Sequence, residues 1–228
     1  MPDALLLDWE GCLADTVSMR ESALQRALQD EGLTLSDADC ARCCEGASAD
    51  TGVRRALSIL GTRDPVLAGL VAARASRAFA ERLGKGFILK RGAHEMLSNA
   101  QVTSRIAIVT QASRSETEFA LRLAGLDITV STIVSASDEL QPPPSPAPFI
   151  AALAQLAKRR ASRPDRSVAI ASSAAMLRSA RSAGLRTIAL AAPAHVGLDA
   201  DGAVDTLEDL TMSALSLIAG IAAAEHSR

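Results

Sequence analysis

The sequence predicts an α/β fold, in which helices cover a parallel sheet and a separate helical domain is inserted after the first strand. Three observations predict it. The run ALLLD at residues 4–8 is typical of a strand that is buried on both faces. No good strand follows before about residue 83, although apolar residues recur there at helical spacing. Beyond that point strand-like and helical segments alternate, and parallel neighbours require such helical crossovers.

The inserted helical domain is predicted over residues 14–86. Apolar residues spaced three and four apart mark three segments, which read ESALQRALQDEGL, DTGVRRALSIL and PVLAGLVAARASRAFAERL. They indicate a block of three or four helices. Residues 1–13 and 87–228 then form the α/β core, a three-layer arrangement of the Rossmann-like type.

In the rest of the core, strands and helices follow one another in turn. The predicted helices are RGAHEMLSNA, SETEFALRLAGL closed by Gly125, FIAALAQLAKRRA, SAAMLRSARSAGL ending at Gly184, and TLEDLTMSALSLIAGIAAA. The predicted strands are SRIAIVT, ITVSTIVSAS, RSVAIAS and RTIALAA, and QPPPSPAP is predicted to be a rigid loop.

Composition restricts the partners. The net charge is −2, from 24 basic and 26 acidic residues, which gives no electrostatic reason to expect nucleic acid or an anionic membrane as a partner. The sequence has no long uncharged apolar run. Its N-terminal segment MPDALLLDWE carries acids where a secretory signal carries Lys or Arg. We therefore expect a cytoplasmic protein, either a monomer or a homodimer.

The four cysteines are predicted to be ordinary reduced thiols. Cys40 and Cys43 form a C-x-x-C pattern next to Cys44, and Cys12 lies far away in sequence. A zinc site needs a second pair of ligands at suitable spacing, which the sequence lacks. A redox dithiol normally follows a strand, whereas these cysteines lie in a polar, helical segment.

The polar residues that follow the predicted strands are the candidate site. Asp8, Thr110 and Ser172 each stand at the end of a strand, and the loop before Pro142 follows another. In parallel α/β sheets, ligands bind outside the carboxyl ends of the strands. We expect these residues to cluster there, with the helical domain above them as a lid.

These segments together resemble the haloacid dehalogenase (HAD) superfamily, and in particular its branch of phosphoglycolate phosphatases and β-phosphoglucomutases with a helical cap. LLLDWEGCLADT is similar to the first motif of that family, D-x-D-G-T-L-x-D-S after an apolar strand. AIVTQAS is similar to the second motif, the proline loop stands at the third, and SVAIASSAAMLRSARSAGLRTIAL at the fourth.

The resemblance implies a role for each position. Asp8 would be the nucleophile that forms an aspartyl intermediate, and Glu10 would be the general acid and base. Thr110 would contact the transferring group, with Gly11 and Gln111 binding substrate. Magnesium would bind the Asp8 carboxylate and the Glu10 backbone.

The chain departs from the family pattern where charge is needed. Glu10 replaces an Asp, and Cys12 replaces a Thr. Pro143 stands at the motif-three lysine, and Ala171 and Ser172 stand at the motif-four acids. We therefore expect magnesium to be a doubtful cofactor and magnesium-dependent activity to be weak or lost.

Other charged residues could compensate for these losses: Lys85, Lys90, Asp138 and Glu139. The resemblance as a whole implies hydrolysis of phosphomonoesters, acting on a small phosphorylated metabolite or another small anion, with activity weakened or lost. One alternative is an inactive module that binds a ligand or a protein. A weaker alternative is a metal-independent dehalogenase, suggested by the Ser-Ser pair at 172–173.

Overall fold

The computed structural model describes residues 1–158, 161–190 and 200–220. Its centre is a six-stranded parallel sheet with the strand order β3-β2-β1-β4-β5-β6. The strands are β1 (Ala4–Leu7), β2 (Arg105–Val109), β3 (Thr132–Val134), β4 (Val168–Ala171), β5 (Arg186–Leu190) and β6 (Gly202–Val204). Because β1 lies between β2 and β4, the residue that follows it is placed at the middle of the sheet edge. The predicted α/β fold class is confirmed.

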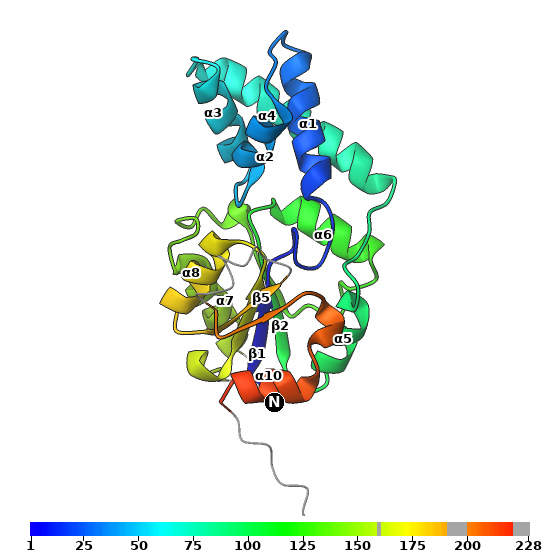
Figure 1. Cartoon of the computed structure of the whole chain (residues 1–228), viewed down its shortest axis with the longest axis vertical. Coiled ribbons are helices and arrows are strands. Elements are labelled where there is room, and N and C mark those ends of the chain that lie inside the picture. Colours follow the sequence, from blue (N-terminus) through cyan, green and yellow to red (C-terminus); the bar gives the residue numbers. More distant parts are fainter. Residues whose placement is uncertain (159–160, 191–199, 221–228) are drawn as a thin grey trace, which may run out of the picture.

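Helices cover both faces of the sheet and make three layers (Figure 1). They are α5 (Ala93–Ala100), α6 (Arg114–Leu123), α7 (Ala147–Ala157), α8 (Ala174–Ser182) and α10 (Met212–Ile218). Alternate residues of β1 point to opposite faces, because the side-chain period of a strand is two. Leu5 and Leu7 pack in the same cluster as buried residues of α5, α6 and α10. Ala4 and Leu6 pack with residues of α7 and α8.

The other four helices form a separate hydrophobic cluster at one end of the molecule (Figure 1). They are α1 (Val17–Gln29), α2 (Asp37–Cys44), α3 (Ala49–Ile59) and α4 (Pro65–Gly84), called here the cap helices. Ser36, Ser48 and Asp64 cap the N-termini of α2, α3 and α4 by accepting backbone N–H groups, as short polar side chains do. The domain boundaries at 13/14 and 86/87 stay a prediction.

Two neighbouring segments connect the cap helices to the core. Asp15 N donates to Ile88 O at 2.8 Å, and Lys90 N donates to Leu13 O at 2.9 Å. The outgoing segment carries Trp9, whose ring meets the Phe87 ring edge-on with centroids 5.6 Å apart. The two connecting segments are therefore joined by backbone hydrogen bonds and by the packing of two aromatic rings.

Some elements differ from the sequence-based expectation. Strand β6 was not predicted, because three residues are too few to show a period. The expected strand at 128–137 is limited to Thr132–Val134. The expected final helix is divided into the 3-10 turn Leu207–Asp209 and α10. Parts of three predicted elements, at 159–160, 191–192 and 221–224, lie outside the described residues.

Candidate active site

The strand ends bring the predicted residues together. Asp8 N donates to Ile170 O of β4 at 3.2 Å, and Thr110 N donates to Val134 O of β3 at 2.9 Å. Each residue thus continues the hydrogen bonding of its neighbour strand just past the carboxyl edge. The Thr110 hydroxyl donates to the Asp8 carboxyl, so the ends of β1 and β2 are in direct contact.

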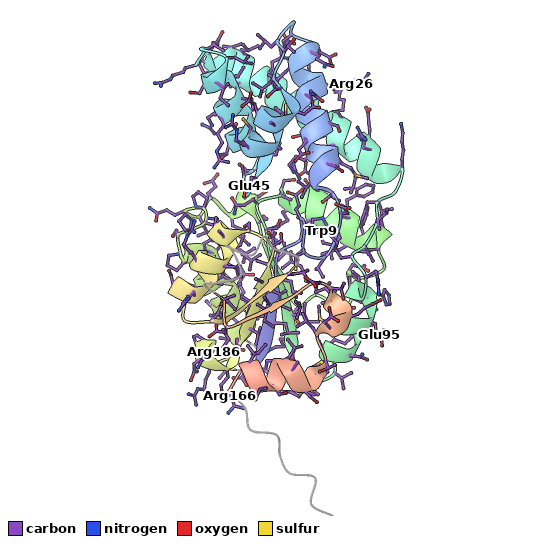
Figure 2. The ribbon with its side chains drawn as sticks, in the orientation of Figure 1. Trp9, Arg26, Glu45, Glu95, Arg166 and Arg186 are labelled. Carbon is purple, nitrogen blue, oxygen red and sulfur yellow. The ribbon has the colours of Figure 1, made fainter. Side chains whose placement is uncertain are left out.

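A cavity of about 350 Å³ lies between this edge and the cap helices. Figure 2 shows its two sides, with Glu45 at the lower edge of the cap helices and Trp9 at the upper edge of the core. The core lines the cavity with Asp8, Glu10, Gln111, Ser172 and Ser173; the cap helices and their connections line it with Val17, Arg20, Glu21, Ala41, Arg42, Cys44, Glu45, Gly46 and Ala47.

Asp8 is buried, and its protonation follows from that. Burial raises the pKa of Asp8 to about 8, and the charge of Glu10 adds to the rise. The groups that oppose the rise are the backbone N–H groups of Trp9 and Glu10 and the hydroxyl of Thr110, none of which is charged. At neutral pH the Asp8 carboxyl is therefore mostly protonated.

Gly11 allows the loop after β1 to approach β4 closely. Its φ is +75°, which an L side chain rarely adopts. A Cβ at this position would lie 2.7 Å from Ser172 Oγ. Gly11 therefore has a packing role against Ser172; it is not among the residues that line the cavity.

Glu10 is held by a side chain from the cap helices. Arg20 Nε lies 2.8 Å from Glu10 Oε1 and 3.1 Å from Oε2, and Arg20 Nη2 lies 2.8 Å from Oε1. Arg20 Nη2 also lies 3.4 Å from Glu116 Oε2 on α6. Burial lowers the pKa of Arg20, but the charges and hydrogen bonds of the two glutamates outweigh it and raise that pKa.

Sequence comparison decides the family. The sequence model of the haloacid dehalogenase-like hydrolase family matches residues 5–190. The chain belongs to this family. A search of curated proteins finds no match to the sequence.

Solved structures show the same fold as this HAD-family chain. β-Phosphoglucomutase from Clostridium difficile has a TM-score of 0.85 at 16% identity, covering 96% of this chain and 98% of that one. CbbY from Rhodobacter sphaeroides, solved with phosphate, has a TM-score of 0.83 at 22% identity, covering 95% and 100%. A predicted phosphoglycolate phosphatase from Haemophilus somnus has a TM-score of 0.79 at 18% identity, covering 91% and 95%.

Of the positions that differ from the HAD pattern, Glu10 and Ser172 line the cavity. Ala171 is the last, buried residue of β4. Pro143 is not among the lining residues, so the proline loop adds no charge there. Cys12 is buried, and its thiol lies 3.5 Å from Ile170 O.

The four residues considered as substitutes are not among the residues that line this cavity. Lys85 is exposed and lines a different groove between α1 and α4. Lys90 lies 3.7 Å from Asp15, and Glu139 is exposed.

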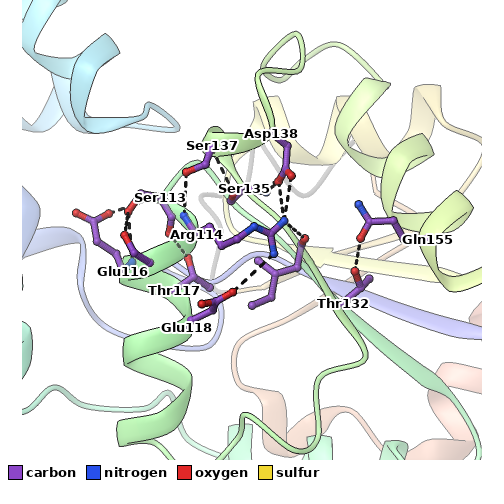
Figure 3. Close-up of polar contacts among 12 residues, drawn as sticks. Ser113, Arg114, Glu116, Thr117, Glu118, Thr132, Ser135, Ser137, Asp138 and Gln155 are labelled. Atoms are coloured by element: carbon purple, nitrogen blue, oxygen red, sulfur yellow. Dashed lines mark hydrogen bonds and ion pairs between the residues drawn. The ribbon is translucent and has the colours of Figure 1, made fainter.

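The fourth substitute, Asp138, is engaged elsewhere (Figure 3). It accepts from the backbone N–H of Ser135 at 2.7 Å and from Arg114 Nη2 at 3.0 Å. Burial raises the pKa of Asp138, but these hydrogen bonds and the Arg114 charge lower it overall. Its carboxylate holds the start of α6 against the end of β3.

The core side of the cavity offers magnesium a single unpaired carboxyl. Mg²⁺ needs near-octahedral oxygen ligands and usually one or two carboxylates. Here Asp8 is the one carboxyl without a cationic partner on the core side of the cavity, because Glu10 is held by Arg20. In the parts of the chain that the structure describes, no group of three or more His, Cys, Asp or Glu residues could hold a metal ion.

Arg20 is the main site residue that the sequence reasoning missed. A signal was present, since Arg20 shares one helical face with Ala23, Leu24, Ala27 and Leu28, all of them buried. A charged residue on the apolar face of an amphipathic helix needs a buried partner. The partners, however, are Glu10 and Glu116, and the second is 96 residues away.

Proposed function

We propose that the chain is a HAD-family protein of phosphatase ancestry in which magnesium-dependent hydrolysis of phosphomonoesters is weak or lost. The observation that carries the proposal is the lining of the cavity, where Ser172 stands at a family acid position, Pro143 is not among the lining residues, and Asp8 is the one core-side carboxyl without a cationic partner. The ancestry is supported by the family match and by the fold of CbbY, which was solved with phosphate and with xylulose-(1,5)bisphosphate.

The proposed chemistry depends on two proton positions. Attack on phosphorus requires the ionised Asp8 carboxylate, and burial together with the charge of Glu10 raises the pKa of that carboxyl and so opposes its ionisation. Protonation of the leaving group requires a proton on Glu10, whose oxygens accept from Arg20 instead. The longer side chain of Glu10 also moves its carboxyl relative to an Asp, and a displacement on the order of 1 Å can cost about 100-fold in rate.

The test is an activity panel of phosphorylated metabolites, with one 2-haloalkanoic acid added, assayed with and without magnesium beside Asp8→Asn. We expect turnover at or near the level of the Asp8→Asn protein. Turnover that requires both magnesium and Asp8 would contradict the proposal. Release of halide without magnesium would favour the dehalogenase alternative.

We propose retention of small-anion binding in the same cavity as the second candidate function. It is favoured by the polar lining, in which Gln111, Ser172 and Ser173 offer amide and hydroxyl donors and Arg42 of α2, which also pairs with Asp39, adds a positive charge. Calorimetric titration with inorganic phosphate and with a sugar bisphosphate tests it, with Arg42→Met as the variant expected to bind more weakly. Equal, unsaturable heats for both proteins would count against it.

Further proposals concern the domain boundary, the compartment, the oligomeric state and the partners. We propose residues 14–86 as the cap domain, and a cytoplasmic monomer or homodimer with no nucleic-acid partner. No helix within residues 1–158, 161–190 and 200–220 is long and apolar enough to cross a bilayer.

A further inference from the structure

Arg20 lies where three parts of the molecule meet. It belongs to α1 of the cap helices, its partner Glu10 lies in the loop after β1, and its partner Glu116 lies on α6 of the core. Its guanidinium carbon also lies 4.1 Å from the centre of the Phe79 ring on α4. One side chain thus contacts two cap helices and two core segments.

The contact is largely buried, with one side at the cavity. The Arg20 side chain is 6% exposed, and those of Glu10 and Glu116 are 13% and 11% exposed. A largely buried ion pair of this kind differs from a surface pair, because loss of one partner leaves a poorly solvated charge without a counter-charge. The site therefore needs Arg20 in place for both carboxylates to remain there.

Glu116 cannot easily move to follow a displaced Arg20. Its carboxylate accepts from the backbone N–H of Ser113 at 3.1 Å, while the Ser113 hydroxyl accepts from Glu116 N at 3.3 Å. This capping box ties the Glu116 side chain to the start of α6 (Figure 3). Glu116 is a fixed point on the core.

We propose that Arg20 is a positioning residue that latches the cap helices to the core and holds Glu10 in an ion pair. This latch goes beyond the proposed function. It rests on the proposed function for one point only, the role of Glu10 as general acid and base. Arg20 Nε donates to both oxygens of Glu10, which fixes the position of that carboxylate at the edge of the cavity. Any movement of α1 away from the core has to separate Arg20 from Glu10 and Glu116.

The single tryptophan offers a probe of this junction. Trp9 is adjacent to Glu10, is 1% exposed, and packs against Phe87 in the returning segment. Release of the latch should let water reach the Trp9 ring. Fluorescence emission and acrylamide quenching report that change without any substrate.

The experiment compares four single variants of the full chain: Arg20→Met, Arg20→Lys, Glu116→Gln and Arg54→Met. Gln at 116 keeps the capping box but removes the charge. Arg54 pairs with Asp50 on the exposed face of α3 and serves as the matched control. Trp9 emission, acrylamide quenching and hydrogen exchange of the peptides over 13–29 and 84–90 are measured for each.

Arg20→Met should shift Trp9 emission to the red and speed exchange in both peptides at least about tenfold. Arg20→Lys should restore most of the wild-type signal, Glu116→Gln should give a partial change, and Arg54→Met none. The latch is refuted if Arg20→Met matches Arg54→Met. If Arg20→Met fails to fold, the other two variants decide. The latch is then refuted if Arg20→Lys and Glu116→Gln both show the Trp9 fluorescence and hydrogen exchange of the wild type. Because no readout uses turnover, an active phosphatase would overturn the proposed function and leave this result standing.

Discussion

The two walls of the cavity differ in the charge they carry. The core wall, at the ends of the strands, offers Gln111, Ser172 and Ser173 beside a mostly protonated Asp8. The cap wall offers Arg20, Glu21, Arg42 and Glu45. In a HAD phosphatase the resemblance places a lysine and two acids on the core wall; here those positions are Pro143, Ala171 and Ser172.

The difference shows that the fold positions the site independently of the charges in it. Hydrogen bonds between backbone groups, such as Asp8 N to Ile170 O, hold the strand ends together whatever side chains they carry. The chemistry depends on side chains that the backbone does not require. In this chain the ion pair of Arg20 with Glu10 joins the two walls.

Replacement of Arg20 by Met should have the largest effect on stability. It leaves Glu10 and Glu116 buried without a cation, and breaking a buried pair in this way costs about 3–5 kcal/mol. Urea unfolding measures it, with Arg54→Met as the control, since an exposed helical pair contributes about 0.3–0.5 kcal/mol. Equal losses of unfolding free energy in Arg20→Met and Arg54→Met would show that the Arg20 ion pair stabilises the protein no more than an exposed helical pair does.

Replacement of Asp8 by Asn should change how stability depends on pH. The pKa of Asp8 is raised from 3.8 to about 8 in the folded protein, so the folded state keeps a proton that the unfolded state has lost. Its contribution is full below pH 4 and is lost as pH rises through 8, with a slope of up to about 1.4 kcal/mol per pH unit.

Asn cannot titrate, so the variant should gain stability relative to wild type as pH rises from 5 to 8. Thermal unfolding of both proteins across this range measures the difference. If the stability of the two proteins changes with pH in parallel, Asp8 is ionised at neutral pH. The core wall would then carry a negative charge, contrary to the difference between the two walls described above.

The sequence predicted the sheet, the cap helices and the clustering of Asp8, Thr110 and Ser172, because each rests on a local pattern repeated along the chain. It did not predict which partner would hold Glu10. Arg20 and Glu116 meet only because the tertiary fold brings α1 and α6 to the same edge of the sheet, and no periodicity within either helix specifies that contact. Strand β6 was missed for a related reason, since its three residues are defined by pairing with β5.

Replacement of Gly11 by Ala tests how tightly the core wall is packed. The φ of +75° disfavours any Cβ by about 1–2 kcal/mol, and the new methyl group would also displace Ser172 Oγ, 2.7 Å away. Unfolding in urea should show a loss of this size or more. The double variant Gly11→Ala/Ser172→Ala should recover part of the lost unfolding free energy, because the clashing hydroxyl is gone. If it recovers none, Ser172 is free to move away from the new methyl group.

Replacement of Ser172 by Asp should give the smallest effect, and one that requires magnesium. The new carboxylate would lie beside Asp8 on the core wall, where the HAD resemblance places an acid. Without metal, two neighbouring carboxyls should lower the melting temperature. With magnesium at ten times its dissociation constant, binding to the folded state should return about 1.4 kcal/mol. Differential scanning fluorimetry with magnesium, against sodium chloride of equal ionic strength, measures this.

The double variant Asp8→Asn/Ser172→Asp is the control for this gain. It keeps the new carboxylate and removes the old one, so any magnesium response that needs both should disappear. A response that persists in the double variant would show that magnesium binds without the Asp8 carboxylate, either at the new carboxylate at position 172 or beside Glu21 or Glu45. A response that is absent from both would mean that one restored carboxylate is not enough, and that the lysine position at Pro143 also has to be restored before the core wall can hold a phosphate and its metal.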